Sequence, residues 1–227
     1  MMTIEESYQD IVNKIDAACQ RVDRNPAEVE IIAVTKYVSV ATAQAAINVG
    51  VKHLAENRLE GFSKKYEEIG NEVNWHFVGT LQSRKVKEII NQVDYLHSLD
   101  RTSLAKEVNK RTEQTVRCFV QVNTSGEDSK HGLSPENVSE FIDSLEKFPK
   151  IQVVGLMTMA PFDAGEEDIR KYFKRLKGLR DKIKSNNWEH APCEYLSMGM
   201  SNDFEIAVEE GATHVRIGTS LVGNEAE

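Results

Sequence analysis

The sequence is poor in cysteine. Only three occur in 227 residues, at Cys19, Cys118 and Cys193. They are far apart, odd in number and never form a Cys-x-x-Cys pair. This disfavours a disulfide framework and a zinc ribbon, and we expect buried free thiols in a reducing compartment.

Long apolar runs are also missing. The longest are short stretches such as 153–157, whereas a membrane-spanning helix needs about 20 apolar residues. The N-terminus, MMTIEESYQD, has neither the cationic start nor the apolar core of a secretory signal. We therefore expect a soluble, cytoplasmic protein that does not enter a membrane.

Positive charge and the common catalytic motifs are scarce as well. The formal net charge of −8 argues against nucleic-acid binding, because few phosphates could be neutralised. The chain has no G-x-S-x-G elbow, Walker loop or G-x-G-x-x-G. No H-x-x-x-H or H-E-x-x-H pair occurs, so no metal site is expected. The six histidines are scattered: His53, His76, His97, His131, His190 and His214.

What the chain does contain is a regular alternation of short apolar segments and amphipathic ones. Eight segments have the length and the β-branched content of buried strands: 29–36, 53–57, 75–79, 94–100, 117–123, 151–160, 193–199 and 213–218. The clearest helical periodicities cover 4–22, 41–49, 138–145, 166–184 and 202–209.

This alternation predicts a parallel sheet, either open and doubly wound or closed. Eight units within 227 residues favour the closed TIM (β/α)8 barrel. We found no linker or break in composition, and so expect one domain over residues 1–227, with an additional N-terminal helix.

Active sites of such barrels lie at the C-terminal ends of the strands. The first predicted strand ends in Lys36. Partial burial of its stem would lower the pKa of its amine and make it reactive toward a carbonyl group. From spacing alone, a lysine that extends to the surface is the favoured interpretation.

Small and hydroxyl residues follow the last two predicted strands. Met200 and Ser201 follow the seventh, and Gly218 and Thr219 follow the eighth. Backbone N–H groups and hydroxyls there could hold a phosphate, although such residues also form ordinary turns. Ser201 is in addition a suitable N-cap for the helix at 202–209.

The segment 125–136, SGEDSKHGLSPE, is polar and contains glycine. It follows the fifth strand and would lie above the mouth of a barrel. It could act as a lid, provide a basic contact through Lys130 and His131, or be a plain solvent loop.

Several of these segments carry a resemblance that covers nearly the whole chain. The matching segments are WHFVGTLQSRK (75–85), AVTK (33–36), AENR (55–58), SKHGL (129–133), GLMTM (155–159), LSMGMSNDFEIAVEEGAT (196–213) and VRIGTSLVG (215–223). Together they resemble the pyridoxal phosphate homeostasis protein family, also called the YggS/PROSC family. That family is similar in fold to the N-terminal barrel of alanine racemase.

The resemblance implies that Lys36 holds pyridoxal 5′-phosphate (PLP) as a Schiff base. It also implies that Asn57 lies near the ring oxygen and that Arg216 faces the pyridine nitrogen. An arginine cannot take a proton from that nitrogen and would keep it neutral, which disfavours the role of PLP as an electron sink.

The resemblance further implies that Ser201, Gly218 and Thr219 hold the phosphate. Met200 would contribute its backbone. These four residues complete the expected cofactor site, in which no catalytic residue and no metal ligand is assigned.

The expected function is PLP homeostasis, with reversible binding and possible transfer to apo-enzymes. Racemases of this kind carry a second domain that supplies a catalytic tyrosine and dimer contacts, whereas this sequence stops at Glu227. We therefore expect a monomer without robust turnover. A racemase-like PLP enzyme and a phosphosugar-handling barrel without PLP are the alternatives.

Overall fold

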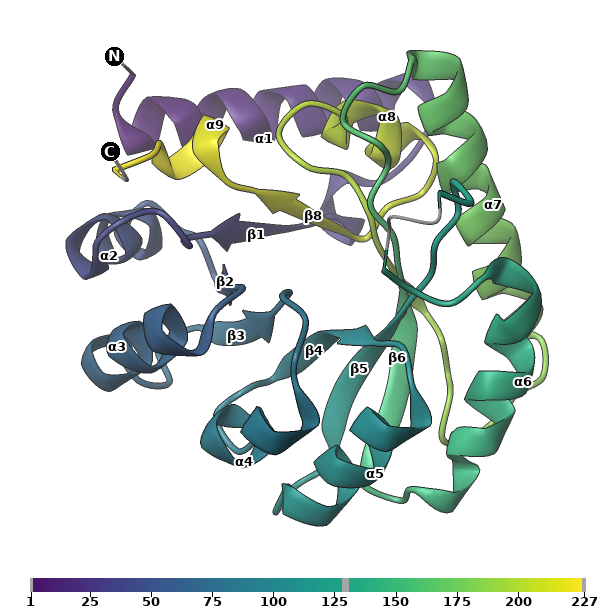
Figure 1. The fold of residues 1–227 in the computed structure, drawn as a ribbon. Helices are drawn as coiled ribbons and strands as arrows, with labels where there is room; N and C mark the ends of the chain where they lie inside the picture. The colour runs from purple at the N-terminus through teal and green to yellow at the C-terminus, as the bar shows by residue number, and fades with distance from the viewer. Residues whose placement is uncertain (1, 128–130, 226–227) are drawn as a thin grey trace.

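The computed structural model describes residues 2–127 and 131–225, and within them it contains a closed barrel of parallel strands (Figure 1). Each strand pairs with the next along the chain, and the last pairs with the first. The strands are β1 (Glu30–Val34), β2 (His53–Glu56), β3 (Asn74–Phe77), β4 (Tyr95–Leu99), β5 (Val116–Gln121), β6 (Ile151–Met157), β7 (Tyr195–Ser197) and β8 (His214–Ile217). All eight predicted strands are confirmed, and so is the TIM-barrel prediction.

Helices surround the barrel. They are α1 (Ile4–Arg21), α2 (Val40–Asn48), α3 (Leu59–Ile69), α4 (Val86–Ile89), α5 (Thr102–Arg111), α6 (Val138–Asp143), α7 (Glu166–Lys184), α8 (Phe204–Glu209) and α9 (Thr219–Val222). Short 3₁₀ turns occupy Pro26–Glu28, Ser83–Lys85, Pro135–Asn137 and Ser144–Lys147. No helix in the described ranges is both long and apolar enough to cross a bilayer.

The N-terminal helix α1 is specified locally at its start. Thr3 accepts a hydrogen bond from the N–H of Glu6, and the Glu6 carboxylate accepts one from the N–H of Thr3. This capping box satisfies two N–H groups that have no partner within the helix. The face that carries Ile11 and Ile15 is buried, and α1 packs against α8 and α9. In Figure 1 the purple α1 therefore lies beside the yellow end of the chain.

The start of α8 differs from the sequence prediction. The helix begins at Phe204, and its N-cap is Asp203 rather than Ser201. A turn comes first, because the Met200 carbonyl accepts hydrogen bonds from the N–H groups of Asp203 and Phe204. The predicted capping role of Ser201 is therefore wrong.

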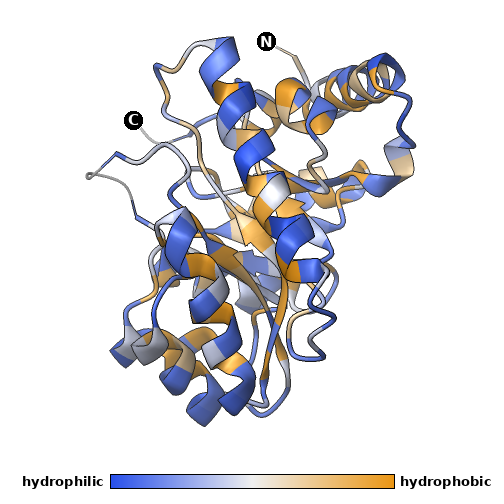
Figure 2. Cartoon of the chain, turned by 90° about the vertical axis from the view of Figure 1, so that its right-hand side faces the viewer, coloured by the Kyte–Doolittle hydropathy of each residue, from blue (hydrophilic) through white to orange (hydrophobic). Residues whose placement is uncertain are grey.

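Apolar side chains pack in two places. Most lie between the strands and the helices, where Figure 2 shows hydrophobic strands and hydrophobic helix faces turned toward one another. A second, smaller cluster of Tyr95, Phe119, Val154 and Met157 is separate from that layer. The three cysteines are free and buried, as expected.

Candidate functional site

Closure of the barrel brings most of the expected site residues onto one arc of the wall. Ala33 of β1 pairs with Ile217 of β8, and Val34 of β1 pairs with Ala55 of β2. The N–H of Arg216 on β8 donates to the carbonyl of Gly199, just after β7. The C-terminal ends of β7, β8, β1 and β2 are therefore consecutive neighbours.

Lys36 lies two residues beyond the end of β1, in a turn. Its side chain is exposed, and Nζ lies 4.6 Å from the centroid of the Tyr37 ring. The last buried position before the turn is Thr35, and the partial burial of the Lys36 stem stays a prediction. The amine is consequently open to a ligand from solvent.

Thr35 attaches this turn to the neighbouring strand. Its hydroxyl donates to Glu56 Oε1 at 2.6 Å, at the end of β2. The same carboxylate oxygen forms an ion pair with Lys65 of α3 at 2.8 Å, and both partners are buried. The backbone immediately before Lys36 is thus held by a fully partnered polar cluster.

The loop after β7 requires a glycine. Gly199 has φ of +93°, and a Cβ there would lie 2.5 Å from the Cβ of Ala207. The next amide is already engaged, since the Met200 N–H donates to Asp203 Oδ1 at 2.6 Å. In this arrangement Met200 has no free N–H to offer a phosphate.

Two hydroxyl groups, one in that loop and one just after β8, remain available to bind a ligand. The hydroxyls of Ser201 and Thr219 have no hydrogen-bond partner within residues 2–127 and 131–225. Gly218 lies open, because the nearest atom to a Cβ built there is the Val34 carbonyl oxygen at 3.7 Å. Space and donors are therefore present at the ends of β7 and β8.

Asn57 follows β2 and is half-buried. Its carbonyl lies so close to Gly79 that a Cβ at that glycine would collide with it. The glycine of the WHFVG segment therefore lets the loops after β2 and β3 approach each other. The structure places Asn57 just after β2, at the end of the arc and beside β1.

Arg216 is 4% exposed, and its guanidinium forms hydrogen bonds with two buried acceptors. Its guanidinium donates to Ser197 Oγ at 2.6 Å and to the Thr158 carbonyl at 2.9 Å. Burial lowers its pKa to about 10, partly offset by the charge of Asp203, so it stays charged at neutral pH. It forms no ion pair with a carboxylate in the described part of the chain.

A row of histidines lies inside the barrel and was not predicted from the sequence. His53, His76 and His97 come from β2, β3 and β4, and their ring nitrogens hydrogen-bond one another at 2.9 and 2.7 Å. One histidine in each of three consecutive predicted strands was the available signal. Over the residues that the structure describes, no group of three or more His, Cys, Asp or Glu side chains is arranged to hold a metal ion.

The segment 125–136 is anchored at its base. The Asn123 N–H donates to the Leu133 carbonyl at 2.8 Å, and the Leu133 N–H donates to the Gln121 carbonyl at 2.9 Å. His131 is exposed. Lys130, the other expected contact, lies outside the described residues, so a role as a lid or basic contact stays a prediction.

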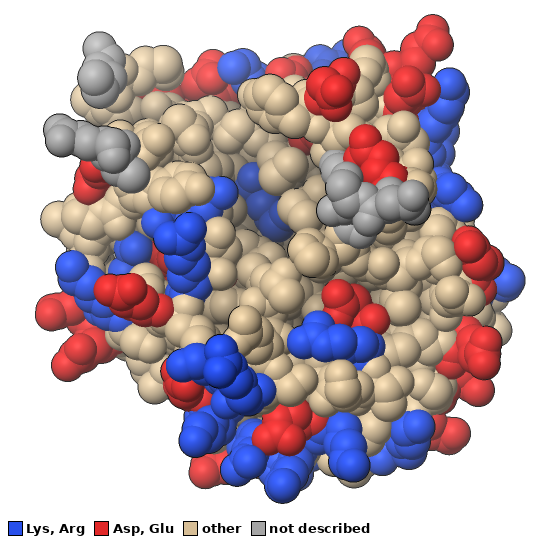
Figure 3. All heavy atoms as spheres, viewed as in Figure 1, with Lys and Arg blue, Asp and Glu red and all other residues tan. Residues whose placement is uncertain are grey.

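The surface around the middle of the barrel is hollowed. Figure 3, in the same orientation as Figure 1, shows a hollow near the centre of this face with basic side chains recessed in it. A hollow with recessed positive charge suits an anionic ligand.

Comparison with known proteins agrees with this geometry. Residues 8–226 match the family described as alanine racemase, N-terminal domain. A relative from Aquifex aeolicus, named pyridoxal phosphate homeostasis protein, is 40% identical over 222 residues and covers 96% of each chain.

Solved structures agree on the fold. PipY of Synechococcus elongatus, determined with PLP bound, has a TM-score of 0.81 and 27% identity, over 92% of this chain and 100% of that one. Alanine racemase from Corynebacterium glutamicum has a TM-score of 0.70 at 15% identity, over 93% of this chain and 59% of the racemase, which shows a shared fold.

Proposed function

The chain belongs to the family of the alanine racemase N-terminal domain and, within it, to the pyridoxal phosphate homeostasis proteins, and from that premise we propose that it binds PLP through Lys36 and serves intracellular PLP homeostasis. Bound PLP supplies an aldehyde that is reactive toward primary amines. The chain's own residues would hold the cofactor, orient it and limit its free concentration.

The observation that carries this proposal is the juxtaposition across the β8–β1 seam. The accessible amine of Lys36 follows β1. Thr219 follows β8, which pairs with β1, and its hydroxyl has no hydrogen-bond partner among the described residues. Ser201 adds a second available hydroxyl from β7. An aldehyde and a phosphate on one small ligand match an amine and a hydroxyl-lined turn on one side of the barrel mouth.

Arg216 and Asn57 complete the proposed site. The buried guanidinium has no carboxylate partner in the described chain, so an acceptor such as a ring nitrogen would suit it. Because arginine only donates, it would keep that nitrogen unprotonated, which favours holding PLP over catalysis. Met200 would contribute through its backbone only after Asp203 releases its N–H.

Spectroscopy tests the assignment of Lys36. Mixing the wild-type protein with PLP should give the absorbance band of a lysine adduct, and borohydride should fix the cofactor on the peptide that contains Lys36. Lys36→Ala should lose the band, whereas Lys52→Ala, which removes an exposed lysine before β2, should keep it. A band that survives in Lys36→Ala would overturn the assignment. A wild-type protein that ignores PLP would favour the phosphosugar alternative.

The second candidate function is a PLP-dependent amino-acid racemase, because the barrel shares the fold of alanine racemase. Such an enzyme needs a second acid or base opposite Lys36, and we propose that this chain supplies none for robust turnover. Incubation of the PLP-loaded protein with single L-amino acids in deuterated water tests this. Deuterium exchange or racemisation at enzyme-like rates would establish the racemase instead.

We further propose that the chain is one domain, a monomer, and cytoplasmic, and that it passes PLP to apo-enzymes. Few large apolar side chains are exposed in the described ranges, and only Met159 and Phe162 share a loop, which favours a monomer. Three free buried thiols agree with a reducing compartment.

Light scattering measures the molecular mass in solution and tests the monomer. Reactivation of a PLP-free aminotransferase by the PLP-loaded protein tests the transfer of PLP to apo-enzymes.

A further inference from the structure

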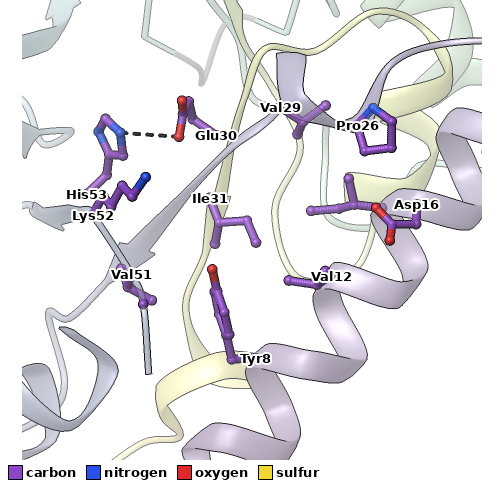
Figure 4. Close-up of a pocket in the computed structure, with 12 residues that line it drawn as sticks. Tyr8, Val12, Asp16, Pro26, Val29, Glu30, Ile31, Val51, Lys52 and His53 are labelled. Carbon is purple, nitrogen blue, oxygen red and sulfur yellow. Dashed lines mark ion pairs between the residues drawn. The ribbon is translucent and has the colours of Figure 1, made fainter. Parts of the chain in front are cut away.

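A continuous hydrogen-bonded row of side chains crosses the inside of the barrel. It starts at Glu30, whose carboxylate lies 3.4 Å from His53 Nε2 (Figure 4). It continues through His76 and His97, and His97 Nδ1 lies 2.9 Å from Ser197 Oγ. Ser197 Oγ in turn accepts from Arg216. The row thus joins the proposed cofactor site to the opposite end of the barrel.

The Glu30 end of the row is open to solvent, whereas the interior of the row is buried. The Glu30 side chain is 48% exposed, and together with His53 it lines a cavity of about 740 Å³ at the N-terminal ends of the strands. His76, His97 and Ser197 have no exposed surface at all. The interior of the row therefore has no access to water and must satisfy its own hydrogen bonds.

The ends also dictate the direction of every hydrogen bond between them. The Glu30 carboxylate can only accept, so His53 Nε2 must carry the hydrogen and Nδ1 must accept. His76 then donates from Nε2, and by the same logic so does His97. The hydroxyl of Ser197 donates to His97 Nδ1, which leaves its lone pairs to accept from Arg216, a residue that can only donate. The opposite direction would place two acceptors face to face at Glu30.

The rings are held in this arrangement by packing and stay neutral. His76 stacks on Tyr95 with centroids 4.5 Å apart, and His97 stacks on Phe119 at 4.3 Å. Burial lowers the pKa of both histidines well below the ordinary value, with smaller contributions from the neighbouring charged groups. A neutral imidazole has one donor and one acceptor, which is what each position in the row requires.

We propose that Ser197, His97, His76 and His53 form an oriented relay that fixes Arg216 in the cofactor site and connects its positive charge to the carboxylate of Glu30. The inference rests on the proposed function, since it assigns Arg216 to the ring nitrogen of PLP. These four are positioning residues and touch no cofactor themselves. A row polarised between a cation and an anion strengthens each of its hydrogen bonds, which makes a buried arginine tolerable although no carboxylate in the described ranges forms an ion pair with it.

The direction of the row can be measured without any cofactor. Long-range ¹H–¹⁵N correlation spectra of the protein at neutral pH should show His53, His76 and His97 all protonated on Nε2. A ring protonated on Nδ1, or an imidazolium at His76 or His97, would overturn the relay. Because PLP is absent, this result is independent of whether the cofactor assignment is correct.

Substitution of Ser197 tests the link to the site, and Ser98 provides a matched control. The Ser98 hydroxyl is buried on β4 and has no hydrogen-bond partner among the described residues. Ser197→Ala should weaken PLP binding on the order of tenfold, because the guanidinium loses an acceptor. It should also shift the ¹⁵N resonances of Arg216 and of His97 Nδ1. Ser98→Ala should change neither, and Ser197→Thr, which keeps the hydroxyl, should restore both.

Equal PLP affinity and unchanged ¹⁵N resonances in Ser197→Ala and Ser98→Ala would overturn the positioning role. A melting temperature measured for each variant separates loss of folding from loss of positioning. Titration of Lys36→Ala distinguishes the two proposals. An absorbance band of a lysine adduct that persists in this variant would contradict the assignment of Lys36, whereas the ¹⁵N shifts of Arg216 and His97 test the relay.

Discussion

At the scale of single residues, glycines decide how closely the loops of the proposed site approach one another. Gly199 has a left-handed backbone at a position where a Cβ would overlap Ala207 of α8, and Gly79 lies against the carbonyl of Asn57. Neither demand is visible from composition, because a glycine in a turn and a glycine under steric contact look alike in a sequence. Each is therefore a structural requirement for the shape of the mouth.

Gly199→Ala should destabilise the protein by about 1–3 kcal/mol, because its Cβ would overlap Ala207 and its φ would be strained. Since the Gly199 carbonyl accepts from the Arg216 N–H, PLP binding should weaken too. Urea denaturation and a PLP titration measure the two effects. Gly178→Ala, in a helix where a Cβ meets nothing within 4 Å, is the control and should be neutral or slightly stabilising. An equal response of both variants would contradict the steric account.

At the scale of secondary-structure elements, the buried ion pair between β2 and α3 holds the end of β1 in place. Glu56 accepts from Thr35 and pairs with Lys65, and all three side chains are buried. The turn that carries Lys36 is thereby attached to an element other than its own strand. A well-satisfied buried pair gives little net stability, but loss of one partner leaves an uncompensated charge.

Lys65→Met should therefore cost about 3–5 kcal/mol of unfolding free energy, because the Glu56 carboxylate would stay buried without a cation. The double variant Glu56→Gln/Lys65→Met should recover most of that loss, since the unpaired charge disappears. Chemical denaturation of both variants measures this. A double variant that is as unstable as Lys65→Met would show that packing, rather than charge, dominates at this position.

At the scale of the whole molecule, the barrel interior holds several neutral histidines, which makes stability depend on pH. Burial lowers the pKa of His214 to about 3 from the ordinary 6.5, and it also lowers the pKa of His53, His76 and His97. In the unfolded chain these groups regain ordinary values and take up protons below pH 6.5. Their contribution to stability is thus fully present above about pH 6.5 and is lost as the pH falls toward the folded-state values.

Each histidine that stays neutral should lower the unfolding free energy by up to about 1.4 kcal/mol per pH unit below 6.5. Urea midpoints at pH 7.5, 6 and 5 should show a shallower decline for His214→Asn than for the wild type. His131→Asn, at an exposed histidine, should follow the wild-type curve. Parallel curves for all three proteins would contradict the assignment of His214 as a buried neutral group.

The sequence by itself determined the strands and the main helices, because these depend on local periodicity, and it also showed which residues follow each strand. The capping role of Ser201 was predicted wrongly, since it depends on how the chain turns after a strand. Only the tertiary structure decided that β1 pairs with β8, which places the strand ends that precede Lys36 and Thr219 side by side despite their separation in the chain. It also decided that histidines from three strands meet inside the barrel. Side chains that face one another across a closed sheet share no local pattern, and their contacts exist only once the barrel has closed.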